Sequence, residues 1–234
     1  MPLYPHIKNL DNCNFSSETI WEGEIKVGYT YKYDSNHPPG RQFISEATDL
    51  HEIPSGQYDF ILSSHVIEHI ANPVKALHEC IRVLKNDGVL IIILPDKDGA
   101  FDHKRKITPL EHMIEDFNNE RGENDLTHLD EILELHDLSR DPQAGTFEEF
   151  KVRSLKNFEN RCLHHHVFNL YSAVGLIDYV QLKIDSTEAV SPHHIIIVAR
   201  KLQNYNNNDR MNLLIKNELR SPFHSDQINN KKNP

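Results

Sequence analysis

Histidine offers the most chemistry in this sequence, with sixteen copies among 234 residues. His65 and His69 follow the strand-like run YDFIL, and His103 follows the aliphatic run VLIIIL. An imidazole titrates near neutral pH and can remove a proton from a reacting group. We therefore take His65, His69 and His103 as candidate catalytic bases. The alternatives are a structural role at a helix start for His69 and an ordinary surface loop for His103.

A zinc hydrolase is a remote alternative. Residues 65–69 read H-x-x-E-H, the inverted zinc-peptidase pattern, in which two histidines one helical turn apart bind Zn²⁺ and the glutamate serves as base. That interpretation requires one helix through all five residues. Asn72-Pro73 restarts a helix only four residues later, and proline disfavours a helical residue before it.

Three consecutive histidines could also contribute to a metal site, because neutral imidazoles are common ligands. Adjacent histidines project in different directions, however, and acidic helices with scattered histidines are usually solvated faces. We therefore predict no metal in the functional site. The run and the residues that could join it are His164, His165, His166, Asp102, His103, His128 and His136.

The elements that must hold these histidines are clearest over residues 58–95. Residues 58–62 (YDFIL) read as a strand, residues 65–85 as an amphipathic helix with Pro73 behind Asn72 as its N-cap, and residues 89–94 (VLIIIL) as a second strand. Uninterrupted aliphatic runs are typical of strands covered on both faces. The order predicts a βαβ unit in an α/β fold.

The remainder of the chain completes this fold. Residues 170–178 predict a helix, and 179–185 and 195–199 predict two strands. Residues 1–200 therefore read as one α/β domain. Residues 201–234 contain nine asparagines and no sustained period, which predicts a disordered tail with at most a helical turn near residues 213–219.

An acidic, mostly helical insertion separates the two halves, over about residues 96–165. Residues 96–150 hold sixteen Asp and Glu against six Lys and Arg, which equals the net charge of −10 for the whole chain. Thr108-Pro109-Leu110-Glu111 reads as a capping box that opens one helix, and residues 126–136 predict another. Like charge makes anionic substrates less favourable here.

Composition excludes several classes of protein. There is no apolar run of about 18 residues and no charged start with an apolar core behind it, so we expect no membrane span, no signal peptide and a cytoplasmic protein. The acidic balance disfavours nucleic-acid binding. The nine glycines are never closer than five residues, which excludes both G-x-G-x-x-G and Walker A loops.

Residues 46–95 resemble the central half of a class I S-adenosylmethionine-dependent methyltransferase of the type 11 group. The resemblance rests on an ordered series of short motifs that begins with E-A-T-D-L, Y-D-F-I and a Glu-His pair. A helix ending in R-V-L-K, a glycine turn and an aliphatic strand ending in proline follow. The resemblance implies a Rossmann-like, mostly parallel sheet, S-adenosylmethionine as cofactor, and methyl transfer to a small-molecule or carbohydrate-type acceptor.

The resemblance also assigns residues to the cofactor. Asp11 would accept from the ribose hydroxyls at the end of the family's second strand. Ser64 and His65, past the strand end, would line the cofactor. The adenine position would fall on Ala47, Thr48, Asp49 and Leu50.

The family's first strand and glycine-rich turn have no counterpart in the sequence, so we expect an N-terminally shortened form of the domain. This opens a non-enzymatic alternative. An inactive methyltransferase-like protein could act as an interaction module, with the acidic insertion binding a basic partner.

Overall fold

The computed structural model describes residues 6–215 and 221–228. The chain divides into two compact units, Met1–Ile53 and Pro54–Pro234, where the sequence predicts one domain over residues 1–200. The boundary falls just ahead of the strand that opens the predicted βαβ unit.

The first unit is a small β structure. Strand β1 pairs in parallel with β5, and β4 pairs with β5 in antiparallel fashion, while β2 and β3 form a separate two-stranded ladder. Gly40 opens β5 where the backbone passes Leu10, since an added Cβ would lie 1.7 Å from the Leu10 carbonyl oxygen. The strands are β1 (Asn12–Asn14), β2 (Glu18–Thr19), β3 (Gly23–Glu24), β4 (Gly28–Tyr31) and β5 (Gly40–Ile44).

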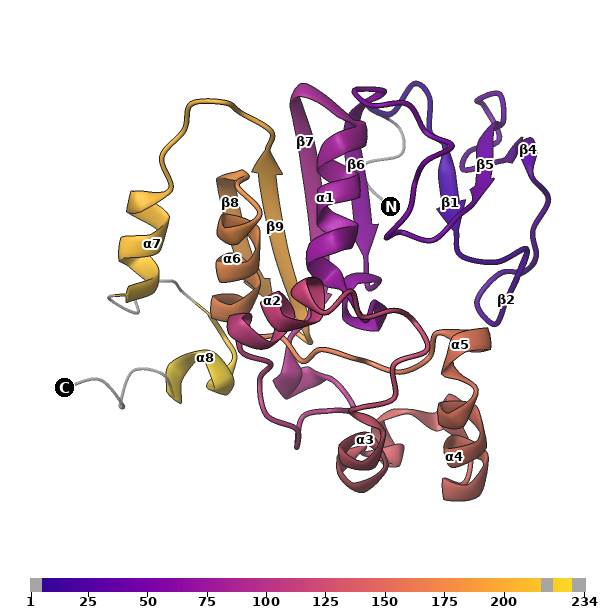
Figure 1. Ribbon diagram of the computed structural model, residues 1–234, viewed down its shortest axis with the longest axis vertical. Coiled ribbons are helices and arrows are strands. Elements are labelled where there is room, and N and C mark those ends of the chain that lie inside the picture. The colour runs from indigo at the N-terminus through magenta and orange to yellow at the C-terminus, as the bar shows by residue number, and fades with distance from the viewer. Residues whose placement is uncertain (1–5, 216–220, 229–234) are drawn as a thin grey trace. The chain divides into compact units, whose positions relative to one another are not determined.

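The second unit is built on a four-stranded sheet in the order β6-β7-β9-β8 (Figure 1). Strands β6 and β7 are parallel, whereas β9 is antiparallel to both β7 and β8. The α/β class is thus confirmed, but the sheet is mixed rather than mostly parallel. The strands are β6 (Tyr58–Ser64), β7 (Leu84–Pro95), β8 (Lys183–Val190) and β9 (His194–Arg200).

Helix α1 (Pro73–Val83) connects the two parallel strands and confirms the predicted βαβ unit. Asn72 caps it, since the Asn72 side chain accepts a hydrogen bond from the Lys75 backbone N–H at 3.0 Å. Proline fits the next position because its missing N–H would have no helical partner there. The predicted helix over residues 65–85 is shorter in fact, because the 3₁₀ turn η2 (Ile67–His69) precedes it separately.

One face of the sheet forms the core. Along β7 and β9, fully buried side chains alternate with half-buried ones, so the aliphatic run buries one face completely and the other in part. Helix α1 packs on β7, and α6 (Leu170–Tyr179) packs on β8 and β9, in front of the sheet in Figure 1. The buried members include Leu77, Leu90, Ile92, Leu94, Ile195 and Ile197.

Strand β8 begins later in the chain than the sequence predicts. Helix α6 continues to Tyr179, and Gln181 has a left-handed backbone with φ of 62°. That turn ends the helix and lets β8 start at Lys183 in register with Arg200 of β9. The prediction of a strand over residues 179–185 is therefore wrong at its start.

The insertion is helical, as predicted, and lies beyond the carboxyl ends of β6 and β7 (Figure 1). The predicted capping box does not form, because the Thr108 hydroxyl accepts from the Val167 backbone N–H and Pro109 occupies the N-cap of α2. Its elements are η3 (Lys97–Gly99), α2 (Leu110–Asn118), α3 (Leu129–Leu135), η4 (Leu138–Arg140), η5 (Pro142–Ala144), α4 (Phe147–Leu155) and α5 (Asn157–Asn160).

The C-terminal region differs from the predicted disordered tail. Helix α7 (Asn208–Ile215) and helix α8 (His224–Ile228) are formed, and residues 216–219 of the predicted turn lie outside the described residues. Ahead of α7, the Asn207 side chain donates to the Leu182 carbonyl and to Asp178. The C-terminal segment, residues 221–228, is held to the domain by backbone and side-chain hydrogen bonds of Ser225 and Asp226.

In the part of the chain that the structure describes, no helix combines the length and the apolar character needed to span a bilayer.

Candidate functional site

The carboxyl end of β6 carries two of the predicted site residues. Ser64 is the last residue of β6, and His65 follows with a left-handed backbone, φ 52°, held by a hydrogen bond from its N–H to the Ile93 carbonyl at 2.8 Å. A non-glycine residue in this conformation carries backbone strain, which is commonest at functional sites. Ligands of open α/β sheets bind outside these strand ends.

Three histidines meet at this strand end. The His65 ring lies 5.7 and 5.2 Å from the rings of His193 and His194, which precede and open β9, and His65 Nε2 is 3.4 Å from His194 Nδ1. Burial, together with these two imidazoles, lowers the pKa of His65 to about 4. His65 is therefore neutral at neutral pH and can accept a hydrogen bond.

The remaining predicted cofactor residues belong to the first unit. Asp11 immediately precedes β1 rather than ending a strand, and its Oδ1 accepts from the Arg41 backbone N–H at 2.7 Å, so this carboxylate has a structural role that its sequence position did not reveal. Asp49 is exposed and contacts the His51 ring at 3.0 Å. Ala47 and Thr48 are half-buried, and Leu50 is buried.

The zinc-hydrolase interpretation of residues 65–69 is wrong. His65 follows the end of β6 and faces His194, while Glu68 and His69 lie in the separate turn η2, so the two histidines do not share a helix. His69 instead joins η2 to the insertion, because its Nδ1 lies 3.0 Å from the Leu163 carbonyl. That contact fits the structural alternative for His69.

Glu68, His69 and His164 form a buried group in which three ligand atoms lie within 4.8 Å of one another. Glu68 is 1% exposed, its Oε2 has no hydrogen-bond partner among the described residues, and burial raises the pKa of its carboxyl to about 7. The His164 Nδ1 lies 2.9 Å from Asp102 Oδ2. This Asp102 contact and the Leu163 carbonyl would orient both rings toward a divalent cation, the usual support of metal-bound histidines.

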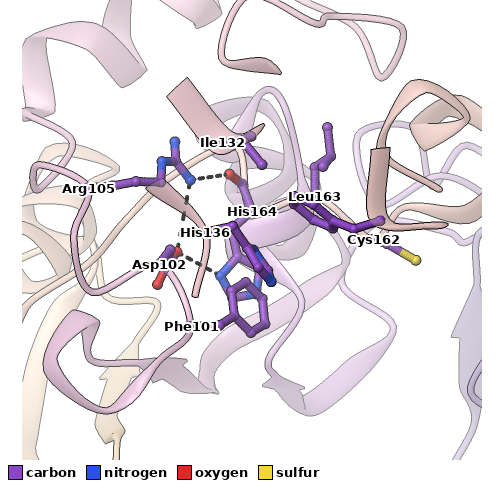
Figure 2. A pocket seen from close by; sticks show the side chains of 9 residues that line it. Phe101, Asp102, Arg105, Ile132, His136, Cys162, Leu163 and His164 are labelled. Atoms are coloured by element: carbon purple, nitrogen blue, oxygen red, sulfur yellow. Dashed lines mark hydrogen bonds and ion pairs between the residues drawn. The ribbon is translucent and has the colours of Figure 1, made fainter. Parts of the chain in front are cut away.

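Asp102 links this group to a buried arginine. Figure 2 shows the Asp102 carboxylate between the His164 ring and the Arg105 guanidinium, which also donates to the His164 carbonyl at 2.6 Å. These residues line a cavity of ≈ 10 Å³, together with Phe101 and His136. Since one water needs about 10–15 Å³, no cofactor fits there.

A larger cleft lies past the carboxyl end of β7. Its volume is ≈ 380 Å³, and Gly99 stands where η3 meets residues 192 and 193, since an added Cβ would lie 2.2 Å from the Pro192 carbonyl oxygen. Clefts of about 300–1,000 Å³ suit small-molecule ligands. The lining residues are Asp98, Gly99, His103, Ser191, Pro192, Pro222, Phe223 and His224.

His103 lines this cleft and is oriented by a carboxylate. Its Nε2 lies 2.9 Å from Asp137 Oδ2, and Asp137 Oδ1 also accepts from the Ser139 backbone N–H and hydroxyl. The Ser139 and His103 hydrogen bonds hold the pKa of Asp137 well below its usual range. Because an ionised carboxylate only accepts, the neutral tautomer that fits this contact carries its proton on Nε2 and its lone pair on Nδ1.

Sequence reasoning missed Asp137, which is 34 residues from His103. It also placed the three consecutive histidines on a solvated face, whereas His164, His165 and His166 are 7%, 2% and 1% exposed. The sequence does not show this burial, because buried positions are predicted from the spacing of apolar residues, and histidine is polar.

Comparison with known proteins finds a partial match to one protein family. Residues 28–92 match the family model described as a methyltransferase domain. The predicted resemblance to a methyltransferase is confirmed over these residues. The methyltransferase match runs from β4 to most of β7, and thus includes Ala47 to Leu50 and the strand end at Ser64 and His65. It stops short of the insertion, which carries His103, and of the other residues that line the cleft.

Solved structures give distant similarities to methyltransferases. An S-adenosylmethionine-dependent methyltransferase from Aquifex aeolicus is 15% identical, with a TM-score of 0.37 over 68% of this chain and 54% of its own. One from Methanosarcina mazei is 15% identical, with a TM-score of 0.42 over 72% and 70%. A putative one from Listeria monocytogenes is 14% identical, with a TM-score of 0.47 over 84% and 81%. The chain spans about half of the Aquifex aeolicus protein. No curated protein sequence matches the chain.

Proposed function

We propose that the protein transfers a methyl group from S-adenosylmethionine to a small, neutral or cationic acceptor. The observation that carries this proposal is the methyltransferase match, which covers the βαβ unit and the strand end at Ser64 and His65. The donor set there suits the cofactor, since a hydroxyl and a neutral imidazole can meet its hydroxyl and amine groups. Thr48 and Asp49 stay proposed contacts of the adenine.

The ≈ 380 Å³ cleft is the proposed acceptor site. Its size fits a sugar or a phenol-sized molecule rather than a macromolecule. The Asp98 carboxylate on its wall, and the acidic insertion that carries it, disfavour an anionic acceptor.

His103 is the proposed catalytic base. The sulfonium methyl that the cofactor supplies is already activated, so the chain's own contribution is orientation of the acceptor and removal of its proton. The His103 Nδ1 lone pair can take that proton, and Asp137 stabilises the resulting imidazolium across the 2.9 Å hydrogen bond. Asp137 is thereby a positioning residue.

Calorimetric titration with S-adenosylhomocysteine tests the cofactor assignment. We expect saturable binding at micromolar to millimolar concentration, weakened in Ser64→Ala. A folded protein that binds neither S-adenosylhomocysteine nor S-adenosylmethionine would overturn the proposal and favour the interaction-module alternative.

Methyl transfer from labelled S-adenosylmethionine to a panel of phenols, amines and monosaccharides tests His103. We expect His103→Gln to slow transfer by about 10²- to 10⁴-fold with unchanged affinity for S-adenosylhomocysteine. His78, exposed on α1 and outside the proposed site, provides the control variant His78→Gln, which should change neither. Equal rates in His103→Gln and the wild type would remove His103 from the mechanism.

A further inference from the structure

A second group of titratable side chains takes no part in the proposed methyl transfer. His112 and Asp116 lie one turn apart on α2, His128 is the N-cap of α3, and His166 precedes α6. We call these four residues the α2 histidine cluster. It gathers three imidazoles and one carboxylate from three separate segments of the unit.

Three of these residues offer ligand atoms close enough to share one ion, and His128 contacts one of the three. His112 Nε2 lies 3.0 Å from His128 Nε2 and 3.4 Å from Asp116 Oδ2, and His166 Nε2 lies 3.8 Å from the same oxygen. Zn²⁺ bonds of about 2.0–2.1 Å in a tetrahedron place neighbouring ligand atoms about 3.3–3.4 Å apart. The ligand atoms of His112, Asp116 and His166 all lie within 4.8 Å of one another.

The Asp116 carboxylate is turned toward the histidines without a normal partner. Its side chain is 8% exposed, and its Oδ2 has no hydrogen-bond partner among the described residues. The other oxygen, Oδ1, lies 3.8 Å from Arg121 Nε, which leaves Oδ2 for the cluster. A buried carboxylate oxygen without a partner costs free energy that a bound cation would recover.

The His166 ring is enclosed by the protein, at 1% exposed. His166 Nε2 lies 3.3 Å from the Ala71 carbonyl, and His166 Nδ1 is buried with no hydrogen-bond partner among the described residues.

We propose that the α2 histidine cluster binds one Zn²⁺ ion, which fastens α2 and the start of α3 to the segment that precedes α6. His112, Asp116 and His166 would supply three ligands, and His128, 3.0 Å from His112, would supply the fourth that a closed, structural zinc site requires. The proposal concerns a region outside the functional site for which the sequence predicts no metal. His112, 31% exposed, gives the ion an entry path.

Calorimetric titration of chelator-treated protein with ZnCl₂ tests the proposal. We expect His112→Ala to weaken Zn²⁺ binding by about 100-fold or more and to abolish the rise in melting temperature that Zn²⁺ produces in the wild type. His69→Gln is the matched control, because it removes a histidine from the Glu68 group and should leave both effects intact.

Two results would overturn the site. One is a folded, chelator-treated wild type that does not bind Zn²⁺. The other is binding that survives in His112→Ala and is lost in His69→Gln, which would place the ion beside Glu68 instead.

Co²⁺ substitution provides a readout that does not depend on stability. Tetrahedral Co²⁺ absorbs visible light far more strongly than octahedral Co²⁺, so the wild type should develop an intense band. Asp116→Asn keeps the size of the side chain and should lose most of that band. An octahedral spectrum in the wild type would contradict a site closed by four protein ligands.

Discussion

Different kinds of interaction stabilise the four-stranded sheet and the insertion beyond its end. The sheet and its helices are joined by aliphatic side chains such as Leu77, Leu90 and Ile195, each 0% exposed. The insertion has a smaller apolar core around Ile132 and Phe150, and it adds a network of buried polar groups with Arg105 at its centre, at 2% exposed. Burial of apolar area tolerates some change of shape, whereas a buried charge requires all of its partners. The insertion is thus the more specific and the more fragile of the two regions.

Loss of Arg105 is expected to have the largest effect. Arg105→Ala would remove the buried cation beside Asp102 and the hydrogen-bond donor of the His164 and His165 carbonyls, which should lower the free energy of unfolding by about 3–5 kcal/mol. Urea denaturation measures this. Lys104→Ala, at an exposed neighbour, should cost no more than about 0.5 kcal/mol. A small loss for Arg105→Ala would remove the contrast between the two regions.

An aliphatic truncation in the sheet should cost slightly less. Leu90→Ala removes a fully buried side chain from the centre of β7 and should lower the free energy of unfolding by about 3 kcal/mol, through lost burial and the cavity left behind. Val152→Ala, on an exposed face of α4, serves as the control. Separate denaturation transitions in the two core variants would show that sheet and insertion unfold independently.

The C-terminal segment should respond to pH in the direction opposite to the histidines. Burial raises the pKa of Asp96 to about 7 and that of Asp226 to about 6, so the folded state favours their protonated forms. Their contribution to the stability of the folded segment is fully present below pH 4 and is lost as the pH rises through 6 and 7. Between pH 8 and pH 5, we expect the segment to gain on the order of 2 kcal/mol of protection in amide hydrogen exchange.

Asp96→Asn imitates the protonated carboxyl and should reduce that pH dependence to the part contributed by Asp226. By contrast, burial lowers the pKa of His165 to about 4, so the contribution of His165 to the stability of the folded state falls as the pH drops below 6.5. Protection of residues 221–228 that decreases toward pH 5 would contradict the assignment to Asp96 and Asp226.

The smallest expected effect is at an exposed helix cap of the insertion. Thr146 caps α4 in a capping box with Glu149, and Thr146→Ala should cost about 1 kcal/mol in denaturant unfolding. Thr146→Ser keeps the hydroxyl and should be near neutral. If Thr146→Ala cost as much as Leu90→Ala, local capping would have to be counted among the main forces of the insertion.

The same contrast explains which parts of the fold can be predicted from sequence. Asn72-Pro73 marks the start of α1, and the aliphatic runs mark β7 and β9, because these signals act within a few residues. The Thr108 capping box fails because Val167, 59 residues away, takes the hydroxyl. Tertiary partners at that distance leave no trace in local pattern.

The candidate site divides in the same way. Ser64 and His65 follow a strand whose end can be located from sequence, and the family match includes them. The orientation of His103 depends on Asp137, and the α2 histidine cluster depends on three segments that meet only in the folded unit. Histidines spaced irregularly over 55 residues, from His112 to His166, cannot be grouped without the fold.

The docked C-terminal segment has a practical consequence for protein engineering. Composition suggests trimming the chain after residue 200, yet Pro222, Phe223 and His224 form one side of the ≈ 380 Å³ cleft. Ser225 also donates to the buried Asp96 and to Asp98. A protein shortened in this way would retain its sheet and lose a wall of the site in which an acceptor screen is to be run, so a negative screen on it would say nothing about the whole chain.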